Sequence, residues 1–187
     1  MMNRRQMLSS MSLAIGGTAL LSPTLFSSCR SDDYEGQFFT GKDITLLNEI
    51  GETILPETTD SPGAKAAKVG NCMDVYVAEC YSLEQQEIIR SGLLTFQSDC
   101  QTKKNKKFER LRPEEQHDFL VKIDQEAKDF QVRPELSTHY FSLLKSLVLF
   151  AYFTSEEGAQ KALRYEAIPR KYVGDFPYKS GEKAWAI

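Results

Sequence analysis

The stretch STHYFSLLKSLVLFAYFTSEEGAQKALRYEAIPRKYVG, residues 137–174, decides the fold of this 187-residue chain. From Tyr140 to Phe153 every residue is apolar except two serines and one lysine, which predicts a helix buried on nearly every side. The run is too short to cross a bilayer, which takes about 20 residues. We therefore expect this helix to lie at the centre of a folded body.

The residues after this run predict a turn, a second helix and a non-helical tail. Thr154 and Glu157 stand at the spacing of a capping box, so we expect a helix that starts there and runs to about Tyr165. Pro169 would stop it. The segment Ile168–Gly174 is too rich in proline, glycine and aromatic residues for a plain linker. Together these features suggest a scaffold that presents a surface.

Toward the N-terminus, the same helical periodicity recurs in four further segments. Capping-box pairs precede two of them, at Thr40–Asp43 and Ser82–Gln85, and Pro113 suits the first turn of another. Pro56–Gly70 is rich in turn-forming residues and predicts an ordered loop. No run alternates with period two. The sequence predicts an all-α fold, a single irregular bundle of about six helices over residues 39–187. The residues expected to face inward on the four further helices are Ile44, Leu47, Ile50 and Ile54; Met73, Tyr76, Val77 and Cys80; Ile89, Leu93, Phe96 and Cys100; and Phe119, Leu120, Ile123 and Ala127.

Residues 1–28 read as an export signal and are left out of the fold. Arg4 and Arg5 precede an apolar stretch rich in small residues, which resembles a twin-arginine signal; an ordinary secretory signal is the alternative. Cys29 follows two small residues and resembles a lipidation site, although Phe26 stands where leucine is usual. Residues 29–38 are polar and acidic and predict a flexible tether. We expect an exported lipoprotein of the periplasm or cell envelope, anchored to a membrane through its lipid.

The charge balance argues against nucleic-acid binding. Without residues 1–28, which hold two arginines and no acid, the chain has 21 basic and 26 acidic residues, a net charge of −5. Nucleic-acid binding needs a basic face. The one basic run, Lys103–Lys107, has no interleaved aromatic residues and is interpreted as a solvated helix end or loop.

Residues that could carry chemistry are few. Cys72 and Cys80 are too far apart on one helix to pair with each other, so either could pair with Cys100, or all three are small buried residues. Glu114 and His117 have the Glu-x-x-His spacing of di-iron bundles, but that motif would have to occur twice, so a solvent-facing histidine is the simpler interpretation. No phosphate-binding loop, dinucleotide fingerprint or serine-nucleophile elbow occurs. The sequence predicts no catalytic, cofactor-binding or metal-binding residue.

Two stretches carry a resemblance to a known family. The first is Ile50–Gly63 (IGETILPETTDSPG). The second is Tyr152–Gly158 (YFTSEEG), followed by Leu163–Tyr165 (LRY), Pro169 and Tyr172–Gly174 (YVG). In this order and at this distance they resemble the gluconate 2-dehydrogenase subunit 3 family, from roughly residue 39 to residue 174.

The resemblance implies a non-catalytic small subunit of a membrane-associated, acceptor-linked sugar, sugar-acid or polyol dehydrogenase. The large flavoprotein partner would carry the FAD and the oxidation, with a cytochrome as a candidate electron acceptor. This chain would bind that partner and assist its export and stability. By motif position, the expected interface residues are Tyr152, Phe153, Tyr165, Pro169, Tyr172 and Gly174.

For each of these residues, a purely structural role is the alternative. Two other functions remain open for the chain: a stand-alone envelope lipoprotein that binds a ligand or a protein, and an enzyme or electron carrier with a metal or haem.

Overall fold

The computed structural model describes residues 34–131, 138–168, 173–177 and 179–186. All of them except Tyr34 belong to one compact unit, Glu35–Ile187. The secondary structure of these described residues is helical, apart from one isolated β-bridge between Arg164 and Trp185. The helices are α2 (Gly41–Ile54), α3 (Val69–Cys80), α4 (Leu83–Lys104), α5 (Pro113–Gln131) and α6 (Tyr140–Phe153), with a 3-10 turn η2 (Phe108–Arg110) and a π turn η3 (Gly158–Ala162). The all-α prediction is confirmed.

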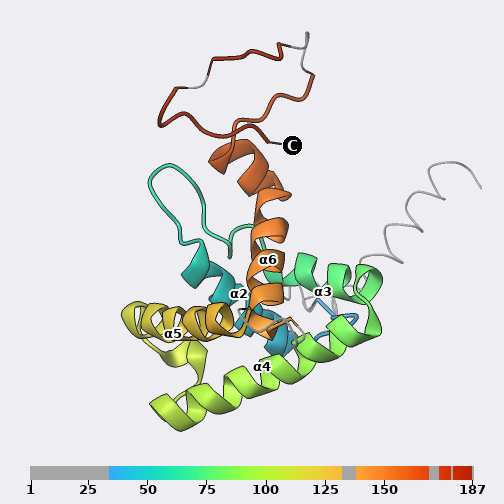
Figure 1. Ribbon diagram of the computed structural model, residues 1–187, viewed down its shortest axis with the longest axis vertical. Coiled ribbons are helices and arrows are strands. Elements are labelled where there is room, and N and C mark those ends of the chain that lie inside the picture. The colour runs from blue at the N-terminus through green and yellow to red at the C-terminus, as the bar shows by residue number, and fades with distance from the viewer. Residues whose placement is uncertain (1–33, 132–137, 169–172, 178, 187) are drawn as a thin grey trace, which may run out of the picture. The chain divides into compact units, whose positions relative to one another are not determined.

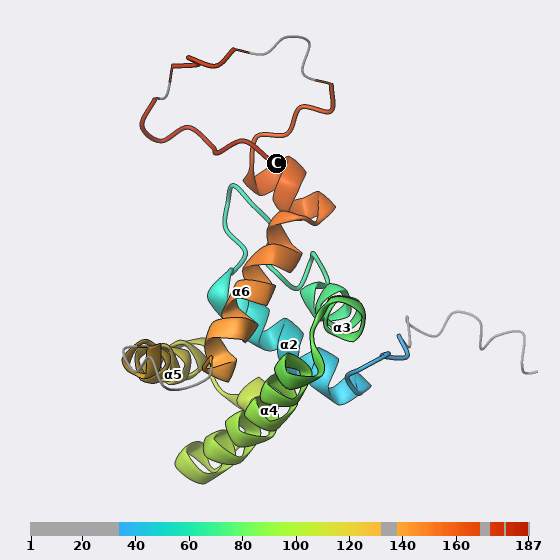
Figure 2. The same cartoon turned by 45° about the vertical axis from the view of Figure 1, so that its right-hand side comes forward.

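Helix α6 is the central element, as its sequence predicts. It packs against α3, α4 and α5, and α2 packs against α3 and α5 (Figures 1 and 2). Its inward side chains are almost fully buried because each faces a neighbouring helix; they are Phe141, Leu144, Leu147, Val148, Ala151 and Tyr152. Phe150 and Phe153 stay partly exposed. None of the helices formed by the described residues is long and apolar enough to cross a membrane.

The predicted helix starts at Thr40, Ser82 and Pro113 are confirmed. Thr40 and Asp43 form a complete capping box on α2, and Ser82 and Gln85 form one on α4. In each box, the side chain of the N-cap residue accepts a main-chain N–H of the first turn. This N–H has no acceptor within the helix itself. Pro113 is the first residue of α5, a position where its missing N–H costs nothing. The basic run after α4 is solvent-exposed or half-exposed, as expected.

Two local predictions are wrong. The predicted inward face of α3 holds for Met73 and Val77, which are buried, but Cys80 is exposed. The buried face of α3 turns instead toward Asp74 and Val69, because α2 and α6 cover that side. The second error concerns the length of the helix after α6: it is present, but as a short π-helix that ends at Ala162 and does not reach residue 165.

One glycine allows α4 to lie close to α6. A Cβ atom at Gly92 would lie 2.2 Å from Cγ of Tyr140 at the start of α6. Carbon atoms do not approach so closely, so the contact requires a residue without a side chain. The neighbouring pairs Phe96–Phe108 and Phe96–Phe119, with ring centroids 5.1 and 5.3 Å apart, extend the core to η2 and α5.

Candidate functional site

The two stretches singled out in the sequence meet in space. The hydroxyl of Tyr152, in the last turn of α6, donates a hydrogen bond of 2.5 Å to the main-chain oxygen of Pro62. These residues are 90 positions apart. We call the assembly of residues 55–64 and 152–163 the corner. Its two halves belong to separate segments that only the packing of α2 near α6 brings together.

The first half of the corner is an ordered loop, as predicted for this segment. Thr58 N–H donates to the oxygen of Ser61, and Ala64 N–H donates to Leu55, both at 2.9 Å. The carboxylate of Glu52 accepts the N–H groups of Glu57 (3.0 Å) and Lys65 (2.8 Å). This carboxylate therefore bridges the two ends of the loop and holds it in one shape.

The second half of the corner is a sharp turn capped by a different residue from the one expected. Thr154 donates back to the oxygen of Phe150 at 2.7 Å and so ends α6. Ser155 Oγ accepts the N–H of Gly158 at 3.0 Å and donates to the oxygen of Tyr152 at 2.7 Å. The prediction that Thr154 caps the second helix is therefore wrong, because the hydroxyl that accepts an N–H at the start of this turn is that of Ser155.

Gly158 is required by the tightness of this turn. A Cβ atom there would lie 1.9 Å from the main-chain oxygen of Tyr152. A main-chain oxygen inside a hydrogen-bonded turn cannot move aside as a flexible side chain can. A substitution here would therefore displace the turn.

The end of the chain returns to the corner. Arg164 N–H donates to the oxygen of Ala184 (2.8 Å), and Ala186 N–H donates back to Arg164 (2.9 Å). The ammonium group of Lys183 donates to the oxygen of Lys161, and at 3.5 Å to that of Asp60. One lysine thus contacts both halves of the corner. The ring of Trp185 packs against Arg164 and Phe176 of its own chain and stays partly exposed.

The predicted interface residues fall into three groups. Tyr152 is 3% exposed, so its ring is packed inside the chain and does not reach the surface. Phe153, Tyr165 and Gly174 are exposed near the corner or in the tail. Pro169 and Tyr172 lie outside the described residues, as do Arg4, Arg5 and Cys29.

A carboxylate that the sequence reading missed fastens the start of the folded body. Asp74 on α3 is 0% exposed and accepts the N–H groups of Gln37 (2.6 Å), Phe38 (2.9 Å) and Phe39 (2.6 Å). A buried carboxylate is tolerated when donors of this kind surround it. In the sequence, Asp74 could have been recognised as a buried carboxylate from its position three residues before Val77, which places it on the inward face of α3. We call this arrangement the Asp74 latch.

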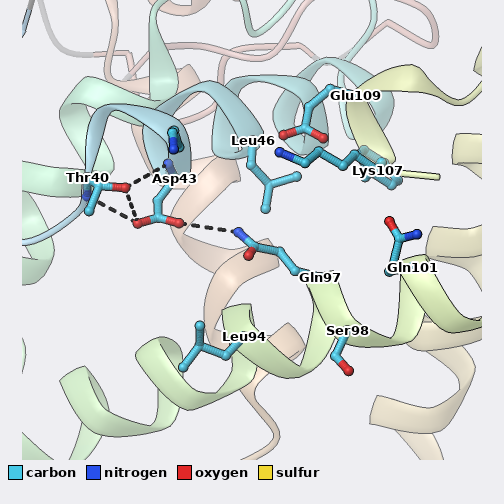
Figure 3. Close-up of a pocket in the computed structure, with 11 residues that line it drawn as sticks. Thr40, Asp43, Leu46, Leu94, Gln97, Ser98, Gln101, Lys107 and Glu109 are labelled. Atoms are coloured by element: carbon cyan, nitrogen blue, oxygen red, sulfur yellow. Dashed lines mark hydrogen bonds between the residues drawn. The ribbon is translucent and has the colours of Figure 1, made fainter. Parts of the chain in front are cut away.

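Two open grooves border α2, and the lining of the second includes Pro56 and Glu57 of the corner. The first, about 420 Å³, lies between α2, α4 and η2 (Figure 3). Gln97 donates across it to Asp43 at 3.3 Å, and its one hydroxyl–carboxylate pair, Thr40 with Asp43, is the cap of α2. The second, about 620 Å³, has an acidic lining in which Lys65 pairs with Glu49 at 2.7 Å. In both, the polar groups have structural partners or face solvent.

The side chains that could perform chemistry have ordinary surroundings. His117 and Glu114 are exposed, as the simpler interpretation of that motif predicts. Burial raises the pKa of the Cys100 thiol, and partial desolvation raises that of the Cys72 thiol although the residue as a whole is exposed. Both shifts favour the protonated, unreactive form. All three described cysteines are free, and Cys72 is exposed as Cys80 is, so only Cys100 fits the buried interpretation. The described residues contain no group of three or more His, Cys, Asp or Glu that could hold a metal ion.

The fold and the corner define a class of small all-α protein in which a buried helix supports two fixed surface segments. Comparison with known proteins gives the family. A model of the gluconate 2-dehydrogenase subunit 3 family matches residues 42–169, and the chain belongs to that family. The family description names a subunit of a gluconate 2-dehydrogenase complex, which implies a dehydrogenase partner. No curated protein and no solved structure matches the chain.

Proposed function

We propose that this protein is the non-catalytic small subunit of a flavin-dependent dehydrogenase that oxidises a sugar, sugar acid or polyol in the cell envelope. The observation that carries the proposal is the family match over residues 42–169, which spans both halves of the corner. In this proposal the FAD and the oxidation belong to the large subunit, with a cytochrome as the candidate electron acceptor. The small subunit binds and stabilises that large partner.

The corner supports a binding role because its shape is fixed before any partner arrives. Glu52 bridges one loop, Ser155 caps the other, and Tyr152 joins them. A preorganised surface loses less conformational entropy on binding than a loop that must first become ordered. The exposed aromatic residues Phe153 and Tyr165 beside it are of the kind enriched in the centres of interfaces.

Export of the partner follows from the proposed signal. The twin-arginine route carries folded proteins, so a large subunit already loaded with flavin could cross as a passenger on Arg4 and Arg5. Lipidation of Cys29 would then anchor the complex to a membrane. The Asp74 latch is suited to this arrangement, because it fixes residues 37–39, which include the last two residues of the proposed tether.

Co-purification from native membranes tests the proposal. The chain is tagged beyond Ile187 through a long linker, the membranes are gently solubilised, and the captured proteins are identified and quantified. We expect a flavoprotein dehydrogenase in equal amount, with a flavin absorbance band. Changing Arg4 and Arg5 to lysine should leave both proteins in the cytoplasm, whereas changing Lys103 and Lys104 to arginine should not. A colourless protein captured alone would refute the proposal and favour a stand-alone envelope lipoprotein.

A further inference from the structure

The residues after η3 form a loop whose first and last residues are hydrogen-bonded to each other. We call residues 163–186 the C-terminal loop. Its ends are joined by the two main-chain hydrogen bonds between Arg164 and residues 184 and 186. In Figures 1 and 2 the described residues of this segment extend from the end of the short helix η3, beyond α6. These hydrogen bonds fix the positions of the two ends of the loop next to the corner.

The C-terminal loop exposes large apolar side chains. Ile168 is 78% exposed, Tyr165 53%, Phe176 47% and Trp185 43%. Long loops without secondary structure are uncommon in compact domains and often bind something. Clustered exposed apolar side chains likewise mark interaction surfaces more often than isolated ones do.

Arg164 contacts two of the aromatic rings of the C-terminal loop. Its guanidinium carbon lies 4.0 Å from the ring centroid of Trp185 and 5.4 Å from that of Phe176. The two rings meet edge to face, with centroids 5.8 Å apart. The rings are attracted to the cation and limit its motion. Among the described residues, no carboxylate lies within ion-pair distance of this guanidinium, so its N–H groups are available.

We propose that Arg164, Phe176 and Trp185, together with the exposed side chains of Tyr165 and Ile168 on the same loop, dock the chain on its dehydrogenase partner. The matching site on the partner is an aspartate or glutamate carboxylate set in an apolar groove. A guanidinium whose N–H groups are free and whose position is fixed binds a carboxylate through two parallel hydrogen bonds. Tryptophan, tyrosine and arginine are also the residues on which binding energy concentrates at interfaces. This inference rests on the proposed function.

The charge pattern favours a protein over a membrane as the occupant. Residues 163–187 carry five basic and three acidic residues in mixed order. Attraction to an anionic bilayer grows with each basic residue near the surface, and Glu166, Asp175 and Glu182 would oppose it. A carboxylate in a groove of matching shape needs only the one arginine.

Subunit exchange in the purified complex tests this inference. Complex containing fluorescently labelled small subunit is mixed with excess unlabelled small subunit, and the release rate is measured. We expect Arg164→Lys, which keeps the charge but loses the planar fork, to speed release about tenfold or more, and Trp185→Ala to do the same. Arg90→Lys is the matched control, because Arg90 lies 4.5 Å over the ring of Phe38, away from the C-terminal loop. It should change the rate less than about twofold.

The outcomes separate this inference from the proposed function. If the complex forms but both loop variants release at the wild-type rate, the docking assignment is overturned while the subunit role stands. If no complex forms with the wild-type chain, the proposed function itself fails. Co-sedimentation with phosphatidylglycerol-containing vesicles is measured in parallel. Vesicle binding lost in Arg164→Lys, with unchanged release from the partner, would assign the loop to the membrane instead and overturn the inference.

Discussion

Replacing Asp74 with asparagine is the sharpest test of how the folded body begins. The substitution keeps the size and shape of the side chain but exchanges one carboxylate oxygen for an NH₂ group. In the latch, Oδ2 accepts from Gln37, and Oδ1 accepts from Phe38 and Phe39. An asparagine has one carbonyl oxygen, so at least one of the three main-chain N–H groups would face another donor.

The expected loss follows from these contacts. A hydrogen bond to a charged group contributes about 1.5–3 kcal/mol, and a buried donor left without an acceptor costs about 1–3 kcal/mol. The remaining bonds would also lose their charge assistance. We therefore expect the free energy of unfolding to fall by about 3 kcal/mol, a large share of a typical domain's stability. With a urea dependence of about 2 kcal/mol per molar, the unfolding midpoint would fall by about 1.5 M.

Urea unfolding of the purified protein, followed by circular dichroism, measures this change. Hydrogen exchange at the amides of residues 37–39 tests whether the segment is released before the body unfolds. Asp118→Asn on the exposed side of α5 is the matched control, and it should alter stability by less than about 0.5 kcal/mol. A loss for Asp74→Asn no larger than that of the control, with unchanged exchange at residues 37–39, would refute the latch.

Three further substitutions, the first with a control, test a helix contact, a hydrogen bond and an ion pair. Gly92→Ala should destabilise the protein by about 2 kcal/mol in urea unfolding, despite alanine's better helix propensity, because its methyl group overlaps the ring at the start of α6. Gly41→Ala, with open space around it, should be neutral within about 0.5 kcal/mol; equal effects would contradict the packing argument. Tyr152→Phe should cost about 1–2 kcal/mol by leaving a loop carbonyl without its donor, and an unchanged midpoint would show that the corner does not depend on this bond. Asp124, whose pKa is lowered by hydrogen bonds from two lysines, stabilises the folded state when ionised, so Asp124→Asn should cost up to about 1 kcal/mol at pH 7. That difference should shrink as the pH falls below about 4, and a difference that is constant down to pH 2 would refute the assignment.

The sequence by itself determined the helices and most of their inward faces. Capping at Thr40 and Ser82 depends on residues three positions apart, so it can be recognised without knowing what lies nearby. The stripe of Ile89, Phe96 and their neighbours is set by the helical repeat alone. The family and the central helix could likewise be predicted, because both rest on continuous stretches of the chain.

Only the tertiary structure decided which of these features act together. The Asp74 latch joins residues about 35 positions apart, and the bond from Tyr152 to Pro62 spans 90. Whether Cys80 is buried depends on which side of α3 its neighbours cover, and not on its own helical position. The capping-box spacing favours Thr154 in sequence, but in the structure Ser155 accepts the N–H of Gly158, because the direction in which the chain leaves α6 places its hydroxyl there. Local hydrogen bonds and periodicity depend on residues close in the sequence, whereas contacts between distant segments form only once the helices have packed.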